Sequence, residues 1–212
     1  MTDLYFDFLC PYAWRGVELA ATLRAGGEGF RLRHYSLAEG NHPDNAQTLT
    51  WRLTDQSGAE GPAHQQGSLR AFVASHAAAG QGEAAHWAFA LALFRAVHED
   101  KQLLDTATLM ATAETAGVDL AAFERALADD QARRAELRAD LDAARELGVF
   151  GTPTFVLPTG EAAYYRFETL TRDPATAREW WTLYRTVLTS EAEIGTVKRA
   201  KNRPPRKGGV KP

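Results

Sequence analysis

Residues 4–14 carry the sequence Leu4-Tyr5-Phe6-Asp7-Phe8-Leu9-Cys10-Pro11-Tyr12-Ala13-Trp14, and this stretch decides the fold. The apolar run from Leu4 to Leu9, broken only by Asp7, predicts a short buried β-strand. Pro11 predicts that a helix begins at Cys10 or Pro11, because proline lacks the N–H that would be unsatisfied in a first helical turn. The free N–H groups and the positive end of the helix dipole would then stabilise a thiolate on Cys10.

Cys10 is the only cysteine among the 212 residues. An internal disulfide, a cysteine zinc cluster and an intramolecular dithiol cycle are therefore excluded within this chain. Two interpretations of the thiol remain. A lone cysteine often packs as a small buried hydrophobe, whereas the succession of strand, Cys-Pro and helix favours a reactive thiolate.

The composition is that of a globular protein, with 45% hydrophobic residues. The first residues, Met1-Thr2-Asp3-Leu4, lack the basic and apolar regions of a signal peptide, and no run of about 18 apolar residues occurs. A single cysteine fits a reducing compartment. We therefore expect a cytoplasmic protein with no membrane partner.

Residues 196–212 are expected to form a basic, disordered tail. Seven basic residues and no acidic ones lie between Lys198 and Pro212, although the whole chain has a net charge of −3. Such a tail can bind an acidic surface, but it holds no aromatic residue for base stacking. Nucleic-acid binding is not expected, and a solvated tail is the favoured interpretation.

The rest of the chain predicts a β-α-β start. A helix should run from Pro11 to about Arg24 and end at the glycines of residues 25–29. Apolar and polar residues alternate over residues 30–37, the period of a strand with one buried face. Two strands that flank a helix favour parallel pairing.

The second half predicts helices followed by a β-β-α ending. Residues 61–147 contain several helical segments, for which Asp105 and Asp119 are expected N-caps. Residues 154–157 and 162–167 predict two antiparallel strands around a turn. Asp173 and Pro174 open a final amphipathic helix.

This order resembles the DsbA-like branch of the thioredoxin superfamily. Two segments carry the resemblance, Phe6 to Trp14 as the active-site segment and Gly148-Val149-Phe150-Gly151-Thr152-Pro153-Thr154-Phe155 as the cis-proline loop. The implied fold is an α/β, thioredoxin-like fold (β-α-β … β-β-α) with an inserted all-helical subdomain. Residues 1–60 and 148–195 would form the thioredoxin-like domain, and residues 61–147 the insert.

The resemblance implies a site in which Cys10 is the nucleophile. Thr152 and Pro153 would face its sulfur, with a cis peptide bond that exposes backbone groups to a bound thiol or peptide; an ordinary trans proline at a strand start is the alternative. The residues expected to contact the substrate are Pro11, Tyr12, Ala13, Trp14, Thr152 and Pro153. For Trp14, however, a place in the core is the favoured interpretation.

The chain departs from the dithiol members of the family at Ala13, where they have a second cysteine. A C-x-x-C pair resolves its mixed disulfide with the second thiolate, and Cys-Pro-Tyr-Ala cannot. We therefore expect a monothiol oxidoreductase that uses a low-molecular-weight thiol as co-substrate and acts on a small thiol or a protein disulfide, with no tightly bound cofactor.

Two other functions stay open. The same segment also resembles the kappa-class glutathione transferase and 2-hydroxychromene-2-carboxylate isomerase group, with cysteine in the place of their serine. That resemblance implies a thiol-dependent transferase or isomerase with a small organic substrate. A non-catalytic member that binds a partner or senses oxidants through Cys10 is the third candidate.

Asp7 and the histidines complete the candidate residues. A buried carboxylate at Asp7, three residues before Cys10, could accept protons, or it could simply be hydrogen-bonded near the end of the sheet. None of the six histidines shows a ligand spacing with another donor, so no metal is expected. These histidines are His34, His42, His64, His76, His86 and His98.

Overall fold

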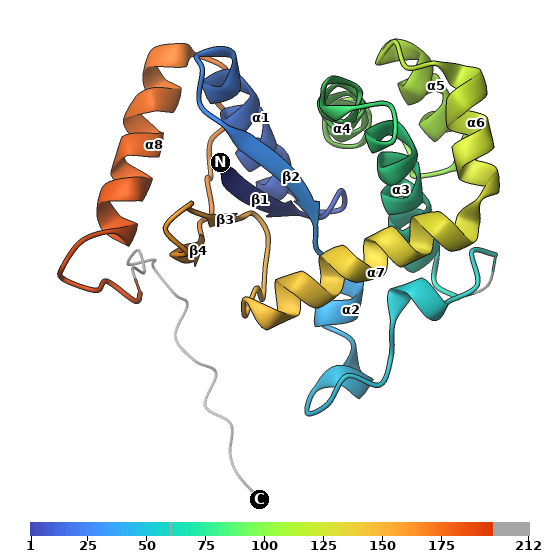
Figure 1. The fold of residues 1–212 in the computed structure, drawn as a ribbon, viewed down its shortest axis with the longest axis horizontal. Coiled ribbons are helices and arrows are strands. Elements are labelled where there is room, and N and C mark those ends of the chain that lie inside the picture. Colours follow the sequence, from blue (N-terminus) through green and yellow to red (C-terminus); the bar gives the residue numbers. More distant parts are fainter. Residues whose placement is uncertain (60, 197–212) are drawn as a thin grey trace, which may run out of the picture.

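The computed structural model describes residues 1–59 and 61–196, so most of the predicted basic tail (196–212) lies outside the described residues. A four-stranded sheet in the order β2-β1-β3-β4 stands at its centre (Figure 1). Strands β1 and β2 are parallel, and β3 pairs antiparallel with both β1 and β4. The strands are β1 (Thr2–Phe6), β2 (Phe30–His34), β3 (Thr154–Val156) and β4 (Ala162–Tyr164).

The helices flank the sheet on both sides. In Figure 1, α3 to α6 gather on the right, α8 stands on the left, and α7 runs from the helical group back toward β3. The helices are α1 (Pro11–Ala25), α2 (Leu37–Gly40), α3 (Ala63–Ala79), α4 (Glu83–His98), α5 (Thr106–Thr115), α6 (Leu120–Ala128), α7 (Asp130–Glu146) and α8 (Pro174–Leu188). The predicted β-α-β … β-β-α order, with helices in between, is therefore confirmed.

Helix ends follow the predicted caps. Asp105, Asp119 and Asp173 each accept a backbone N–H in the first turn of the helix that follows, which satisfies one otherwise free donor. Gly148 has φ +71° just beyond α7, a conformation that glycine adopts without a Cβ penalty.

Four strand ends differ from the predictions, and polar side chains terminate the first two strands early; β3 ends at Val156 rather than at residue 157. β1 ends at Phe6 rather than Leu9, since the Asp7 carboxylate accepts the N–H of Leu9 at 2.9 Å and folds the chain into a turn. β2 ends at His34 rather than at residue 37, because Ser36 caps α2. β4 ends at Tyr164 rather than at residue 167.

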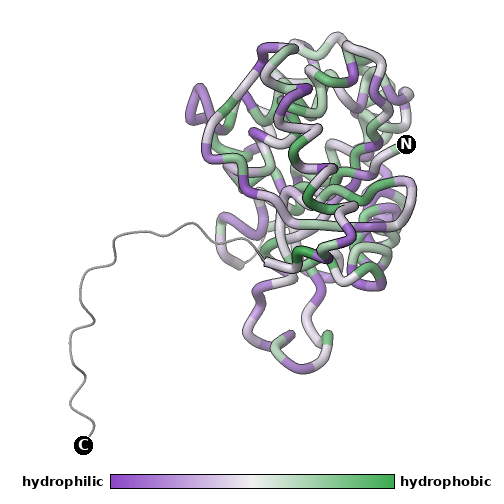
Figure 2. Tube along the Cα trace, turned by 90° about the vertical axis from the view of Figure 1, so that its left-hand side faces the viewer, coloured by the Kyte–Doolittle hydropathy of each residue, from purple (hydrophilic) through white to green (hydrophobic). Residues whose placement is uncertain are grey.

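One apolar core joins the sheet to the helices. Phe6 and Phe8 of the opening stretch pack on Phe94 of α4 and Phe72 of α3, with ring centroids 4.9–6.0 Å apart. On the other side of the core, Phe155 of β3 packs against α8. Figure 2 shows hydrophobic and hydrophilic residues alternating within the same segments, the pattern of elements with one buried face.

Glu18 of α1 ties the first helix to the segments around it. Its side chain is 2% exposed and accepts two hydrogen bonds from Arg95 of α4 and two from Arg172, which precedes α8, at 2.5–3.0 Å. Burial alone would raise the pKa of Glu18, but these hydrogen bonds outweigh burial and hold the pKa at about 2. The ion pairs therefore fix α1, the helix that begins at Cys10, between α4 and the start of α8.

We expect Glu18→Gln to lower the free energy of unfolding by about 2–4 kcal/mol, because two guanidinium groups lose a buried carboxylate partner. Urea unfolding at pH 7 measures this change. Glu83→Gln is the matched control: Glu83 pairs with Arg24 on the surface at 55% exposure and should cost less than about 1 kcal/mol. Equal losses in the two variants would contradict the role assigned to Glu18.

Candidate active site

The Cys10 sulfur lies at the N-terminus of α1, as the position of Pro11 predicts. Cys10 is the N-cap residue, with an extended backbone (φ −91°, ψ 114°), and its Sγ accepts the N–H of Ala13 at 3.4 Å. The thiol in turn donates to the backbone oxygen of Thr152 at 3.3 Å. The side chain is 7% exposed. Cys10 thus faces a helix N-terminus on one side and the loop before β3 on the other.

The loop before β3 forms the wall of the site that lies opposite the helix N-terminus, across the Cys10 sulfur. The Thr152–Pro153 peptide bond is cis, and both residues are buried. Pro153 packs directly on Gly16 of α1: a Cβ at Gly16 would come within 2.8 Å of Pro153 Cβ and Cγ. The absence of a side chain at Gly16 therefore allows the loop to approach the first turns of α1.

The Thr152 hydroxyl is a free polar group at this wall. Thr152 is 2% exposed, and its Oγ1 has no hydrogen-bond partner among the described residues. The next threonine along the chain, Thr154 at the start of β3, has its hydroxyl bonded to the backbone oxygen of Gly151 at 2.7 Å. Buried hydroxyls are usually paired, so Thr152 offers an unused donor and acceptor on the same residue whose backbone oxygen contacts the Cys10 thiol.

The residues that follow Cys10 differ in what they can contact. Pro11 is exposed, whereas Ala13 is completely buried, so Ala13 acts on the sulfur through its N–H rather than its methyl group. The half-buried ring of Tyr12 has the guanidinium carbons of Arg15 and Arg166 at 5.3 and 4.4 Å from its centroid. Cations over an aromatic face are attracted by its quadrupole.

Trp14 is held by His98, a residue to which the sequence analysis gave no role. The two rings stack with centroids 5.5 Å apart, and His98 Nε2 donates to the backbone oxygen of Phe8 at 2.8 Å. Burial lowers the pKa of His98, an effect that this hydrogen bond partly offsets. His98 thereby braces the turn that leads into Cys10, and Trp14 packs against the core.

Asp7 is completely buried between two backbone donors. Its carboxylate accepts the N–H of Leu9 at 2.9 Å and the N–H of Leu37 at 2.8 Å. Burial raises the pKa of Asp7 to about 6, and the two N–H groups only partly oppose that shift. Both carboxylate oxygens therefore have structural partners, and the group can change its charge near neutral pH.

A second polar cluster lies apart from Cys10, and the sequence pattern did not reveal it. His34 of β2 bonds through Nδ1 to Asp140 of α7 at 2.8 Å and through Nε2 to Ser75 of α3 at 2.9 Å. His86 of α4 bonds to the same Ser75 hydroxyl at 3.0 Å. His76 lies beside them, and the centroid of its ring lies 4.3 Å from that of His34. Burial lowers the pKa of His76 to about 2 and that of His86 to about 3, so both are neutral at pH 7.

Comparison with known proteins identifies the family. A family model described as a DSBA-like thioredoxin domain matches residues 1–171, and the chain belongs to this family. Among curated proteins no relative matches the chain. The helices of the described residues all lack the length and apolar character that would let one span a bilayer.

Solved structures with the same fold include both groups that the sequence resembles. A 2-hydroxychromene-2-carboxylate isomerase is 22% identical, covering 88% of this chain and 96% of its own, with a TM-score of 0.62. A probable DsbA oxidoreductase of Streptomyces coelicolor is 24% identical, with a TM-score of 0.60; the match covers 97% of this chain and 96% of the oxidoreductase. The cytosolic disulfide reductase DsbM of Pseudomonas aeruginosa, solved with GSH, is 16% identical, with a TM-score of 0.57; the match covers 87% of this chain and 98% of the reductase.

We expect Gly16→Ala to move the cis-proline loop away from α1, so that the two sides of the site around the Cys10 sulfur separate. The new Cβ would meet Pro153 at 2.8 Å, and such overpacking costs about 1–3 kcal/mol. As the loop moves away, Cys10 becomes more exposed, so its alkylation by iodoacetamide should be faster than in the unchanged protein. Gly29→Ala is the control, since its nearest neighbour would lie 3.8 Å away. Unchanged labelling in Gly16→Ala would show that the loop does not shield the sulfur.

The raised pKa of Asp7 predicts a pH-dependent contribution to stability. Its folded-state pKa of about 6 exceeds the ordinary value of 3.8, so its contribution is complete below pH 3.8 and is lost as the pH rises through 6. Relative to that of Asp7→Asn, the free energy of unfolding of the unchanged protein should rise by about 1.4 kcal/mol from pH 8 to pH 5. Urea unfolding at the two pH values measures this difference. Asp100→Asn, a change at an exposed carboxylate, is the control variant. If the unchanged protein gained the same amount relative to both variants, Asp7 would be ruled out as the source of the gain.

Proposed function

We propose that the chain is a thiol-disulfide oxidoreductase that works through the single thiol of Cys10. The observation that carries the proposal is the position of the sulfur, between the Ala13 N–H at the helix N-terminus and the Thr152 carbonyl of the cis-proline loop. Membership of the DSBA-like family supports the reaction class. Cys10 is the nucleophile, while Thr152 and Pro153, with Pro11 and Tyr12, form the substrate-contacting surface.

The reaction proceeds by two thiol–disulfide exchanges. The Cys10 thiolate attacks one sulfur of a substrate disulfide, the substrate S–S bond breaks, and one substrate thiolate leaves. An external thiolate then attacks the mixed disulfide on Cys10, which releases the Cys10 thiolate and a new disulfide that contains the external sulfur. The external thiol supplies the second sulfur because Ala13 stands where the dithiol members have their second cysteine.

The external thiol is proposed to be a small thiol that carries a carboxylate. Arg15 and Arg166 both lie over Tyr12, two residues from Cys10, and neither guanidinium has a carboxylate within 4.0 Å in the described part of the chain. The P. aeruginosa reductase of the same fold was solved with GSH, a thiol of this chemistry. A cytoplasmic site of action, where such thiols are abundant and reduced, belongs to the same proposal.

A transferase or isomerase is the second candidate function. It rests on the Ala13 N–H, which would hold the sulfur of a bound thiol as it now holds Cys10 Sγ, and on the isomerase with the same fold. In that reaction Cys10 would polarise the sulfur of the cofactor without forming a lasting bond to it. Asp7 is not needed as a proton acceptor in either reaction, since both its oxygens are bonded to backbone N–H groups.

Mass spectrometry of the purified, unreduced protein tests the proposal. We expect a small-thiol adduct on Cys10 that dithiothreitol removes. Turnover of a glutathione-linked disulfide substrate should fall by at least about 1000-fold in Cys10→Ser, because serine cannot form the mixed disulfide. A Cys10→Ser variant that keeps a substantial part of a thiol-dependent isomerase activity would favour the second function. No adduct and no turnover would leave a binding or oxidant-sensing role.

A further inference from the structure

The cluster around Asp140 contains a set of donor atoms that suits a metal ion. His34, His76 and Asp140 each offer one ligand atom, and these atoms all lie within 4.8 Å of one another. His34 and Asp140 are almost completely buried, and His76 is 11% exposed. The three side chains come from β2, α3 and α7, so the fold itself holds them in place.

Two distances within the set are close to the spacing of zinc ligands. Nitrogen and oxygen ligands at about 2.0–2.1 Å from a tetrahedral zinc ion stand about 3.3 Å from each other. Asp140 Oδ2 lies 2.8 Å from His34 Nδ1 and 3.6 Å from His76 Nε2, so the two observed separations bracket that value. For these two pairs, an ion that replaces the proton on His34 Nδ1 needs shifts of only about half an ångström, and the two histidine ligand atoms lie within 4.8 Å of each other.

The unpaired nitrogen of His76 is aimed into this set. Its Nε2 is buried and has no hydrogen-bond partner among the described residues, although the Asp140 carboxylate lies just 3.6 Å away. Both histidines also have an outer partner that would orient them as ligands. Glu136 lies 3.5 Å from His76 Nδ1, and Ser75 lies 2.9 Å from His34 Nε2. Metal-bound histidines commonly have such partners on the second ring nitrogen.

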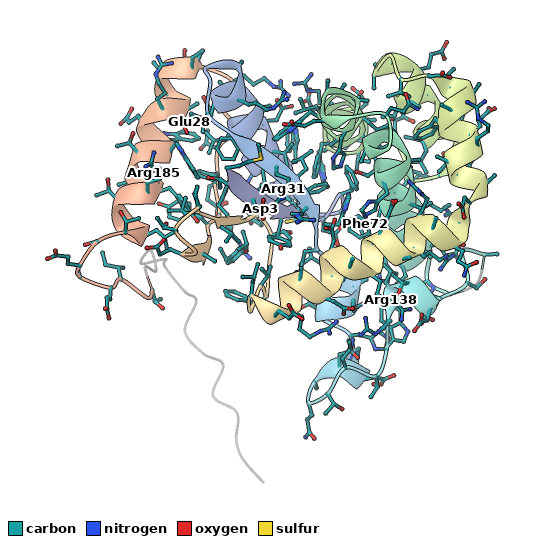
Figure 3. All side chains as sticks on the ribbon, viewed as in Figure 1. Asp3, Glu28, Arg31, Phe72, Arg138 and Arg185 are labelled. Carbon is teal, nitrogen blue, oxygen red and sulfur yellow. The ribbon has the colours of Figure 1, made fainter. Side chains whose placement is uncertain are left out.

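The site has an opening on one side. A cavity of about 350 Å³ is lined by His76, His86 and Asp140 together with Arg31 and Arg33. The nearby arginines do not leave the site strongly positive, because each has a carboxylate partner. Arg31 pairs with Asp3, next to which it lies in Figure 3. Arg33 pairs with Asp140 through Oδ1, which leaves Oδ2 to accept the backbone N–H of His34 at 3.2 Å and to face the two imidazoles.

We propose that His34, His76 and Asp140 form a binding site for a divalent ion of the zinc class, separate from Cys10, with its fourth position open to the cavity. Two imidazoles and one carboxylate form a donor set that suits zinc and its neighbours in the first transition row. Three protein ligands with an open fourth position are the arrangement of zinc sites that also bind water or a small anion.

Zinc titration of the full chain, freed of metal with a chelator, tests this site. Isothermal titration calorimetry should give one ion per chain. Cys10→Ser should bind zinc unchanged, which excludes the thiol as the ligand. His76→Gln should weaken binding at least about 100-fold, and Glu136→Gln, which removes only the outer partner, about 10–100-fold. His64→Gln is the matched control, since His64 is an exposed histidine on the same helix, and it should bind as the unchanged protein does.

Cobalt provides a second readout that does not depend on affinity. Co²⁺ held by two imidazoles and a carboxylate should give visible d–d bands without a sulfur-to-metal charge-transfer band in the near ultraviolet. Glu136 is 44% exposed, so Glu136→Gln should fold normally even if His76→Gln does not. The proposal is overturned if no zinc binds, if Cys10→Ser abolishes binding, or if both His76→Gln and Glu136→Gln bind zinc as tightly as His64→Gln.

Discussion

The contact between the start of α1 and the loop before β3 is the constraint on which the rest of the site depends. Cys10 and Thr152 lie 142 positions apart, yet the thiol donates directly to the Thr152 carbonyl. Antiparallel pairing of β1 with β3 makes this possible, because the end of β1 lies opposite the start of β3, with Tyr5 paired to Thr154. Gly16 then allows Pro153 to pack against the helix without a gap. The ion pairs of Glu18 hold the same helix from its other side.

Most of this arrangement was predictable because local rules specify it. Pro11 marks a helix start, Asp105, Asp119 and Asp173 cap helices, and Gly148 ends one; each effect acts within one turn of the chain. The strand ends were harder to predict. Asp7 ends β1 partly through Leu37, thirty residues away, and no local pattern contains that partner.

The side-chain networks could not be predicted for the same reason. His34, Ser75 and Asp140 come from three separate elements, and no spacing along the chain relates them. Trp14 and His98 are likewise brought together only by the packing of α1 on α4. A hydrophobic period identifies which face of an element is buried, but it does not say which polar side chains of other elements meet there.

The two contacts of the Cys10 sulfur use its hydrogen-bonding capacity in both directions. Sγ accepts the Ala13 N–H at the helix N-terminus, and the thiol donates to the Thr152 carbonyl. A substrate N–H that pairs with the Thr152 carbonyl would compete with the thiol for that acceptor. In the exchange proposed for Cys10, such a substrate would displace the contact that holds the thiol against the cis-proline loop, while the Ala13 N–H stays in place because it belongs to α1. Thr152 thus couples the binding of a substrate backbone to the hydrogen bonding of the sulfur that would react with it.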